Sequence, residues 1–271
     1  MKNIYIRIFS ALLLSMTILG CDKTDGALYS GESNKLSFLS PTINLNMETG
    51  TLLVPITRTS SNGDFSAPVS LAVSNEKDLD YLDVFKVDGD VNFKNGEAKA
   101  FVSIKYGNTG NINPSGFVTT LSGSDVIAKV AFPLQLKISK ENLSATTMPT
   151  VNVLASSEVE FDKESNTGKL NSKDGWFGDE FDVDIQQAKN GSQIYKLIKP
   201  FGYSNISFMV DADGETVVCP NQVIDTHPDY GPVSITSVKG KKSGKRIVLD
   251  VGSYSVSAGS FGGGVEIIDL P

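Results

Sequence analysis

The sequence contains very few of the side chains on which most enzymes and metal sites depend. Its 271 residues include two cysteines, one histidine and one tryptophan. A serine triad needs a histidine, and a structural zinc site is built from several cysteine and histidine ligands. His227 stands beside Pro228, where we expect an exposed loop, and no Gly-x-Ser-x-Gly motif accompanies it. The chain therefore lacks the parts of a serine hydrolase, and it cannot build a zinc site from cysteine and histidine alone.

The chain also has only one long apolar stretch, at its N-terminus. Two basic residues precede the run Ile8 to Leu14, and the segment closes with Ile18-Leu19-Gly20-Cys21. This pattern matches a bacterial lipoprotein signal, in which cleavage before the cysteine is followed by acylation of its thiol. An uncleaved transmembrane anchor is the alternative, but the apolar run is too short to span a bilayer comfortably. We predict a signal peptide over residues 1–20, lipid on Cys21 and a polar tether over residues 21–34.

The charge of the mature chain limits its partners. Removing residues 1–20 takes away Lys2 and Arg7 and leaves 22 basic against 31 acidic residues, a net charge of −9. An acidic surface repels phosphate backbones and anionic lipid head groups, so we expect no nucleic acid partner and membrane attachment only through the N-terminal lipid. The residues that follow the cysteine, Asp22-Lys23-Thr24-Asp25, resemble surface-export signals of Bacteroidetes lipoproteins. We expect a lipid-anchored outer-membrane protein of the cell envelope, with exposure on the cell surface left open.

Helical periodicity is missing from the rest of the chain, and an alternating pattern takes its place. From Lys35 onward apolar residues recur at every second position, which is the period of half-buried strands. The segment Val130 to Ile138 shows this most clearly, and Pro133 within it suggests an edge strand or a bulge. Asn-Gly and Asp-Gly pairs between the strands predict tight hairpin turns. These pairs are Asn62-Gly63, Asp88-Gly89, Asn95-Gly96, Asn190-Gly191 and Asp213-Gly214.

A change in composition divides the chain into two parts. Serine, threonine and asparagine gather between residues 139 and 150, and Met148-Pro149 closes the stretch. Such a segment is typical of the passage from one domain to the next. We predict a first β domain over residues 35–140, a linker over 141–150 and a second β domain over 151–271.

Three motifs in the first domain resemble those of a Calx-β domain. They are Met47-Glu48-Thr49-Gly50 leading into Leu52-Leu53-Val54-Pro55-Ile56-Thr57-Arg58, then Asp80-Tyr81, then Val91-Asn92-Phe93-Lys94-Asn95-Gly96-Glu97. The Glu-x-Gly turn opens a strand, the arginine ends it with charge, and the phenylalanine before Asn-Gly anchors a hairpin. The resemblance implies an immunoglobulin-like β-sandwich.

Calx-β domains that bind calcium gather carboxylates from such loops, so the resemblance implies Glu48, Asp80 and Glu97 as candidate ligands. Calcium takes about six to eight oxygen ligands. The later Asp-Asp run that usually supplies several of them is missing, and Ile104-Lys105-Tyr106-Gly107-Asn108 stands in its place. We therefore favour solvated turn carboxylates and expect no cofactor, with calcium as the one ion that the resemblance leaves open.

The second domain resembles the C-terminal domain of uncharacterised Bacteroidetes surface lipoproteins, which are often associated with polysaccharide use. The segments that carry this resemblance are Thr167–Leu170, Trp176–Phe181, Tyr195–Leu197, Val210–Gly214 and Ser257–Gly263. Together with the alternating pattern, the two resemblances imply an all-β protein of two antiparallel domains. The first is an immunoglobulin-like sandwich, and the second is a β-sandwich or a barrel.

Carboxylates are the remaining route to catalysis. Glycoside hydrolysis needs two of them about 5–10 Å apart in a cleft, one with a raised pKa. The acidic residues from Asp179 to Asp184 interleave with apolar ones, so the simplest interpretation is the solvated face of a strand. The run Asp211 to Glu215 invites a calcium-loop interpretation, but its spacing does not fit an EF-hand, and a hairpin turn explains it.

Aromatic residues of the second domain are the best candidates for a ligand site. Trp176, Phe177, Tyr203, Tyr230 and Phe261 stand among glycines and polar residues, where loops could present them. Exposed aromatic faces stack on sugar rings, and we take the first four as the candidate ligand-binding residues. The alternative for Trp176, which its size favours, is that it fills the core of the second domain.

These observations favour a non-catalytic binding protein. Our leading hypothesis is a carbohydrate-capture accessory of a polysaccharide-uptake system, whose partner is a glycan. The alternative is a protein-interaction or adhesion module whose partners are envelope proteins. A third hypothesis, a glycoside hydrolase, requires a carboxylate pair that periodicity does not reveal.

Overall fold

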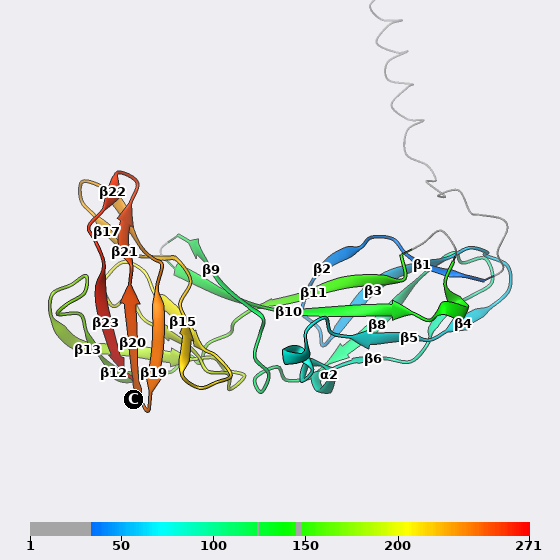
Figure 1. Ribbon diagram of the computed structural model, residues 1–271, viewed down its shortest axis with the longest axis horizontal. Helices are drawn as coiled ribbons and strands as arrows, with labels where there is room; N and C mark the ends of the chain where they lie inside the picture. The colour runs from blue at the N-terminus through cyan, green and yellow to red at the C-terminus, as the bar shows by residue number, and fades with distance from the viewer. Residues whose placement is uncertain (1–33, 124, 145–147) are drawn as a thin grey trace, which may run out of the picture.

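The computed structural model describes residues 34–123, 125–144 and 148–271, and over these ranges the regular secondary structure is almost all β-strand (Figure 1). The strands form two β domains, which we call the sandwich and the barrel, so the predicted all-β class is confirmed. The predicted signal peptide, Cys21 and all but the last residue of the tether lie outside the described residues. Within the described ranges, no helix has the length and apolar character that crossing a membrane requires.

The sandwich is built from two larger sheets and a short two-stranded sheet, β4-β7. The first sheet has the order β1-β3-β8-β6, with β1 Leu36–Phe38, β3 Thr51–Arg58, β8 Lys99–Tyr106 and β6 Phe85–Val87. The second has the order β2-β11-β10-β5, with β2 Thr42–Asn46, β11 Thr150–Glu158, β10 Asp125–Ile138 and β5 Val69–Ala72, and β9 Gly116–Ser122 also pairs with β10. The remaining elements are β4 Phe65–Ala67, β7 Val91–Phe93, α2 Tyr81–Val84 and the 3-10 turns Glu76–Asp78 and Lys140–Asn142.

The alternating residues of these strands form the core of the sandwich. Along β10 every second residue from Val126 to Ile138 is buried, as the sequence pattern predicts. Phe132 from this strand packs against Tyr81 and Phe85, with ring centroids 5.4 and 5.6 Å away. The one-turn helix α2 therefore forms because its first residue plugs the core between the sheets, where the Tyr81 hydroxyl donates to the Asn113 carbonyl at 2.7 Å.

Arg58, the charged residue that ends β3, is only 2% exposed. Its guanidinium donates to backbone carbonyls of the neighbouring turns, including Glu97 at 2.6 Å and Gly63 at 2.9 Å, and lies 5.3 Å from the Phe93 ring centre. Buried carbonyl oxygens need donors, and this arginine supplies them where three segments meet.

Pro133 lies in an inner strand, not in the edge strand that its presence suggests. β10 pairs with β11 along one side, and on the other side it pairs first with β9 and then with β5. The β9 pairing ends at Ala131 and the β5 pairing begins at Gln135, so Pro133 falls in the gap between them. A residue without an N–H is tolerated there because no ladder hydrogen bond is needed on that side.

The hydrogen-bonded sheets divide at a different place from the expected linker, although the domain limits themselves stay predictions. β11, assigned from the sequence to the second domain, pairs antiparallel with β10 and parallel with β2 in the sandwich. The barrel begins with β12 at Asn166. Parallel pairing of β2 with β11 joins segments more than 100 residues apart, and turn signals do not reveal such a connection.

The barrel closes on itself through its first and last strands. Its order is β12-β13-β14-β15-β16-β19-β20-β23, and β12 pairs with β23 to complete the ring. The strands are β12 Asn166–Asn171, β13 Glu180–Gln187, β14 Ile194–Leu197, β15 Ile206–Val210, β16 Thr216–Val218, β19 Lys239–Ser243, β20 Arg246–Val251 and β23 Gly264–Asp269. Gly191 and Gly214 adopt positive φ in the turns where the Asn-Gly and Asp-Gly pairs predict it.

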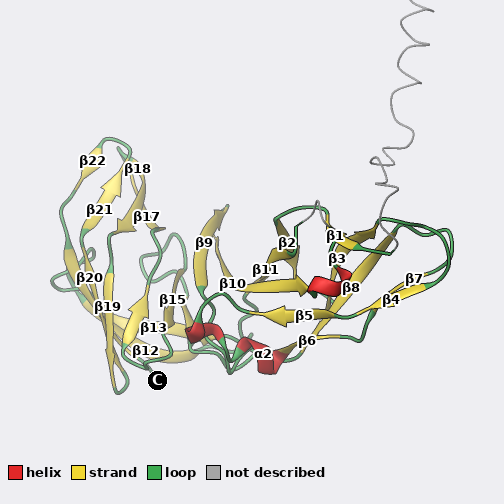
Figure 2. Ribbon diagram, turned by 45° about the vertical axis from the view of Figure 1, so that its right-hand side comes forward, coloured by secondary structure: helices red, strands yellow, loops and turns green. Residues whose placement is uncertain are grey.

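A second sheet projects beyond the rim of the barrel (Figures 1 and 2). It has the order β17-β18-β21-β22, with β17 Gln222–His227, β18 Gly231–Thr236, β21 Ser253–Val256 and β22 Gly259–Ser260. β20 continues through Gly252 into β21, which carries the chain from the barrel wall into the projecting sheet. The inner residues Ile224, Val233 and Ile235 of this sheet belong to the barrel core, so its base is anchored while its far end is exposed.

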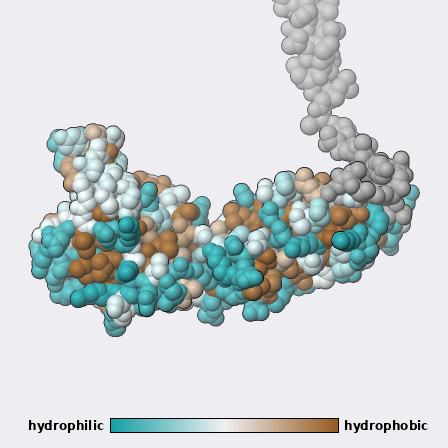
Figure 3. Space-filling model, viewed as in Figure 1, coloured by the Kyte–Doolittle hydropathy of each residue, from teal (hydrophilic) through white to brown (hydrophobic). Residues whose placement is uncertain are grey.

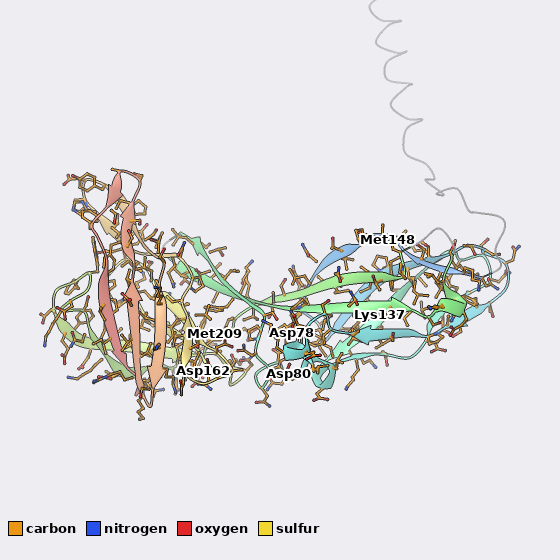
Figure 4. All side chains as sticks on the ribbon, in the orientation of Figure 1. Asp78, Asp80, Lys137, Met148, Asp162 and Met209 are labelled. Atoms are coloured by element: carbon orange, nitrogen blue, oxygen red, sulfur yellow. The ribbon has the colours of Figure 1, made fainter. Side chains whose placement is uncertain are left out.

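The sandwich and the barrel are held together by apolar and polar contacts. Ile194 and Met209 of the barrel are buried within the core cluster of the sandwich, and Figure 4 shows Met209 on the side of the barrel that faces the sandwich. Hydrogen bonds join Asn205 to Asp125 at the β9–β10 hairpin and Asn113 to Asp211 at the β15–β16 turn. Burial of apolar side chains at the junction couples the two domains.

Candidate functional site

The far end of the projecting sheet carries a group of aromatic rings, which we call the rim cluster. It consists of Trp176, His227, Tyr230, Tyr254 and Phe261, and neighbouring ring centroids lie 4.9–5.9 Å apart. The residues come from the β12–β13 loop, the end of β17, the β17–β18 turn, β21 and the loop before β23. The pairing of β17, β18, β21 and β22 thus gathers rings that are up to 85 positions apart in the sequence.

Exposure increases through the rim cluster from Tyr254 to Phe261. Tyr254 is buried, Trp176 and His227 are half-buried, and Tyr230 and Phe261 are 47% and 46% exposed. The two outer rings therefore present apolar surface to solvent on a support of packed rings. In Figure 3 this end of the molecule, at the upper left, has a pale and tan surface between more hydrophilic areas.

Polar groups lie directly beside these rings. The indole Nε1–H of Trp176 donates to Oδ2 of Asp225 at 2.8 Å, and Oδ1 accepts no hydrogen bond from the residues that the structure describes. Asp225 follows an irregularity in the β17–β18 pairing, and such a bulge turns side chains away from their regular direction. Nδ1 of His227 accepts the Asp229 N–H at 3.2 Å, so in the neutral ring Nε2 carries the proton and can donate to a ligand.

Glu266 of β23 supports the rim cluster from inside the fold. It is 4% exposed, and its Oε1 accepts the backbone N–H of Trp176 at 2.8 Å and the Tyr254 hydroxyl at 2.7 Å. Burial raises the pKa of Glu266 above its ordinary value of 4.5, and hydrogen bonds from Trp176, Tyr254 and Ser172 oppose that rise. Burial and the neighbouring glutamate also raise the pKa of Tyr254, which therefore remains a donor at neutral pH.

The backbone beside Glu266 leaves no room for a further side chain. A Cβ at Gly175 would lie 2.6 Å from Cδ of Glu266, closer than such atoms approach. A Cβ at Gly264 would lie 2.6 Å from the carbonyl oxygen of Asp174. The two glycines allow the β12–β13 loop to approach β23, and this approach brings Trp176 within reach of the glutamate.

A second group of rings lies on the barrel and consists of Phe177, Phe181 and Phe201, which we call the phenylalanine cluster. Their centroids are 5.2–6.4 Å apart, and Phe177 is 56% exposed. Phe201 is buried in the barrel core. The three rings have no polar ring atom with which to orient a ligand. They extend the packing of the barrel core towards the surface.

The four predicted ligand-binding residues therefore lie in different parts of the second domain. Trp176 and Tyr230 meet in the rim cluster through Phe261, whereas Phe177 belongs to the phenylalanine cluster. Tyr203 is half-buried in the β14–β15 connection and makes no ring contact among the described residues. Trp176 is half-buried and packs against the edge of the barrel core, where the N–H groups of its indole and backbone hold it at the rim.

Three further residues, His227, Glu266 and Tyr254, belong to the site but were not predicted from the sequence. His227, expected in an exposed loop, is the half-buried last residue of β17 and stacks on Phe261 at 5.4 Å. Glu266 had a visible signal, since it shares the inward phase of β23 with Ile268, where an apolar residue belongs. Tyr254 had no such signal, because a tyrosine suits a buried strand position with or without a ligand site nearby.

The three calcium candidates are separated by the fold. Glu48 lies in the turn before β3 and lines one groove, Asp80 precedes α2 and lines another at the junction, and Glu97 lies in the turn before β8. Figure 4 shows Asp80 beside α2. Across the described ranges, no group of at least three histidine, cysteine or acidic residues is placed to hold a metal ion. The proposed calcium ligands therefore do not meet at one site.

The predicted roles of the other carboxylates are confirmed. Asp182 and Asp184 lie on the exposed face of β13, whose inward residues are Val183 and Ile185, and the run from Asp211 to Glu215 is the β15–β16 turn. Glu266 has the raised pKa that glycoside hydrolysis requires, but it is buried and its Oε1 already accepts two hydrogen bonds. This carboxyl group has no direct access to a glycosidic oxygen in solvent.

No protein-family model matches the chain, and no curated protein matches it. A Bacteroides ovatus protein of unknown function is 13% identical, with a TM-score of 0.32 and coverage of 87% of this chain and 93% of that one. A Bacteroides ovatus multidomain protein including DUF1735 is 12% identical, with a TM-score of 0.29 and coverage of 87% and 92%.

A third solved structure is an auxiliary nutrient binding protein from Bacteroides thetaiotaomicron. It is 12% identical, with a TM-score of 0.31 and coverage of 85% of this chain and 89% of that one. At these identities and TM-scores, the likenesses determine neither the fold nor the function of this chain.

Proposed function

We propose that this protein is a non-catalytic, lipid-anchored envelope protein that captures carbohydrate for a polysaccharide-uptake system, with the rim cluster as its binding site. The observation that supports the proposal is the pair of exposed rings, Tyr230 and Phe261, resting on Trp176 and His227 beside the carboxylate of Asp225.

The chemistry of the rim cluster suits a sugar. The C–H faces of a pyranose are apolar and stack on aromatic rings, while its hydroxyl groups need acceptors and donors at the ring edge. Phe261 and Tyr230 provide apolar faces, Oδ1 of Asp225 is an acceptor, and Nε2 of His227 is a donor in the neutral ring. The apolar faces of a bound sugar would therefore stack on rings, and its hydroxyl groups would have hydrogen-bond partners.

The local charge favours a neutral glycan. Asp225 and Asp229 contribute negative charge next to the rings, and the rim cluster itself contains no lysine or arginine. A uronic acid or sulfated sugar would meet like charge at this site, and repulsion between like charges lowers affinity. We therefore expect neutral polysaccharides to bind more tightly than polygalacturonate.

The proposed anchor makes weak binding sufficient. Acylation of Cys21 would confine the protein to a thin layer at the membrane, where its effective concentration for membrane-bound partners is high. The name of the Bacteroides thetaiotaomicron structure, an auxiliary nutrient binding protein, describes a role of the same class, but the proposal depends on the rim cluster alone.

Affinity electrophoresis tests the proposal. The protein from residue 22 onward is run through gels that contain neutral polysaccharides or polygalacturonate, beside a Tyr230→Ala/Phe261→Ala double variant. We expect retardation by at least one neutral glycan and none for the double variant. Phe177→Ala, which removes an exposed ring from the phenylalanine cluster, is the matched control. Free migration of the unmodified protein in every gel would refute carbohydrate capture.

A protein-interaction role is the second candidate, and exposed apolar side chains on the sandwich favour it. Leu53 of β3 and Phe101 of β8 are each 52% exposed and lie on the outer face of their sheet. Apolar patches of this kind mark contact surfaces in many proteins. Cross-linking in intact cells, with Phe101→Glu as the comparison, tests this role, and it fails when the unmodified protein captures no envelope partner.

A further inference from the structure

We propose that Glu266 is the positioning residue of the rim cluster and that its ionisation controls how firmly Trp176 and Tyr254 are held. The effect on ligand affinity rests on the proposed function, whereas the effect on the rings does not. Glu266 touches no ligand, because it is buried behind the residues that it positions.

Glu266 joins two segments that are distant in the sequence, the β12–β13 loop and β21. Its Oε1 accepts the Trp176 N–H from the β12–β13 loop and the Tyr254 hydroxyl from β21. The Trp176 ring lies 5.4 Å from both Tyr254 and Phe261, and its Nε1 is fixed by Asp225. One carboxyl oxygen therefore sets the position of the tryptophan on which an exposed ring of the cluster rests.

Ionisation changes the strength of both hydrogen bonds. A carboxylate accepts hydrogen bonds that are roughly twice as strong as those accepted by a neutral carboxyl group. Protonation of Glu266 weakens its hold on the Trp176 N–H and on the Tyr254 hydroxyl at the same time. The burial that raises the pKa of Glu266 moves this change towards neutral pH.

Few titratable groups lie close enough to Glu266 to cause the same pH-dependent change. Tyr254 from β21 is the titratable group that contacts Glu266, and the β12–β13 loop contributes the neutral donors of Trp176 and Ser172. Leu249 faces Glu266 in the register with β20. Asp225 and His227 of β17 contact Trp176 and Phe261 instead, so they serve as controls.

The single tryptophan provides a readout that needs no ligand. Because Trp176 is the only tryptophan, intrinsic fluorescence reports on the rim cluster directly. We expect the emission of the unmodified protein to change in one transition above pH 4.5 and expect Glu266→Gln, which keeps the shape but cannot ionise, to lack it. Asp225→Asn and His227→Gln should retain the transition. Its persistence in Glu266→Gln, or its absence from the unmodified protein, would overturn the proposal.

Tyr254→Phe gives an independent test should Glu266→Gln not fold, as judged by circular dichroism. The Tyr254 hydroxyl lowers the pKa of Glu266 by donating to it, so its removal should move the midpoint to higher pH. An unchanged midpoint counts against the proposal.

Ligand binding separates this proposal from the proposed function. For a neutral glycan that the protein retards, we expect affinity to fall about three- to tenfold as Glu266 becomes protonated and to stay constant over that range in Glu266→Gln. Glycan binding that does not vary with pH would contradict the regulation and leave carbohydrate capture standing. A fluorescence transition without any glycan binding would support the positioning role and refute carbohydrate capture.

Discussion

The rim cluster and the phenylalanine cluster begin at neighbouring residues, Trp176 and Phe177, and reach different environments. Trp176 packs between the buried ring of Tyr254 and the exposed ring of Phe261, whereas Phe177 joins two phenylalanines over the barrel core. Both residues lie in the bend of the β12–β13 loop, and this one loop supplies a ring to each cluster.

The contrast shows that exposure alone does not identify a ligand site. Phe177 is more exposed than Phe261, yet the three rings of the phenylalanine cluster carry no polar ring atom of their own. The rim cluster combines apolar faces with Asp225, His227 and a buried support in Glu266. Convergence of apolar and polar groups distinguishes a candidate binding surface from packing that extends to the surface.

Removing Trp176 should produce the largest difference between the clusters. Trp176→Ala loses the ring contacts to Tyr254 and Phe261 and leaves Asp225 without its donor, so we expect unfolding to become easier by about 3 kcal/mol. Phe177→Ala removes a mostly exposed ring and should cost about 1 kcal/mol. Urea denaturation measures both values, and equal losses would contradict the structural distinction.

Adding a methyl group beside Glu266 should disturb only the rim cluster. Gly175→Ala forces the glutamate away from the loop, and we expect a loss of about 2 kcal/mol together with a shift in Trp176 emission. Gly178→Ala is the matched control, because its φ of 79° makes the substitution strained while no atom lies within 4 Å of the added Cβ. That control should lose stability without a shift in Trp176 emission. A shift in both variants would weaken the assignment of Glu266 as the residue that positions Trp176.

Glycan affinity should separate the two exposed phenylalanines. We expect Phe261→Ala to lower the affinity for a neutral glycan about tenfold, which corresponds to about 1.4 kcal/mol, because the stacking face is lost. Phe177→Ala should change affinity less than about twofold. Calorimetric titration measures both, and a larger loss in Phe177→Ala would move the site to the phenylalanine cluster.

The smallest expected effect is the dependence of stability on pH. The pKa of Glu266 is raised in the folded state, so its contribution to stability is fully present below pH 4.5, where both states are protonated. That contribution is lost as the pH rises through the folded pKa, because the unfolded chain ionises without a burial cost. Urea denaturation of the unmodified protein and Glu266→Gln between pH 4 and 8 measures it, and parallel curves would contradict this assignment.

Local chemistry made much of the fold predictable. Alternation from Val130 to Ile138 predicted β10, and Asn190-Gly191 and Asp213-Gly214 predicted turns in which the glycines adopt positive φ. These signals are local because side-chain direction in a strand and the tolerance of glycine for positive φ depend on nearby backbone. The place of Pro133 was misjudged, since a gap between β9 and β5 is a property of two other strands.

The candidate site could be predicted only in part. Trp176 and Tyr230 were found because large aromatic residues stood in loop-like surroundings, but Phe177 and Tyr203 had the same signal and lie elsewhere. Composition around a residue does not state which way its side chain points. That direction followed from the approach of the β12–β13 loop to β23.

The sequence by itself determined the strand character of the chain, most of its tight turns and the acidic charge that argues against nucleic acid. Each of these depends on neighbouring residues or on composition. Only the tertiary structure decided that β2 pairs with β11, that the barrel closes through β12 and β23, and that a buried glutamate meets a tryptophan 90 positions away. Such contacts join distant segments through packing and burial, and no local pattern encodes which distant partner gives the lowest free energy.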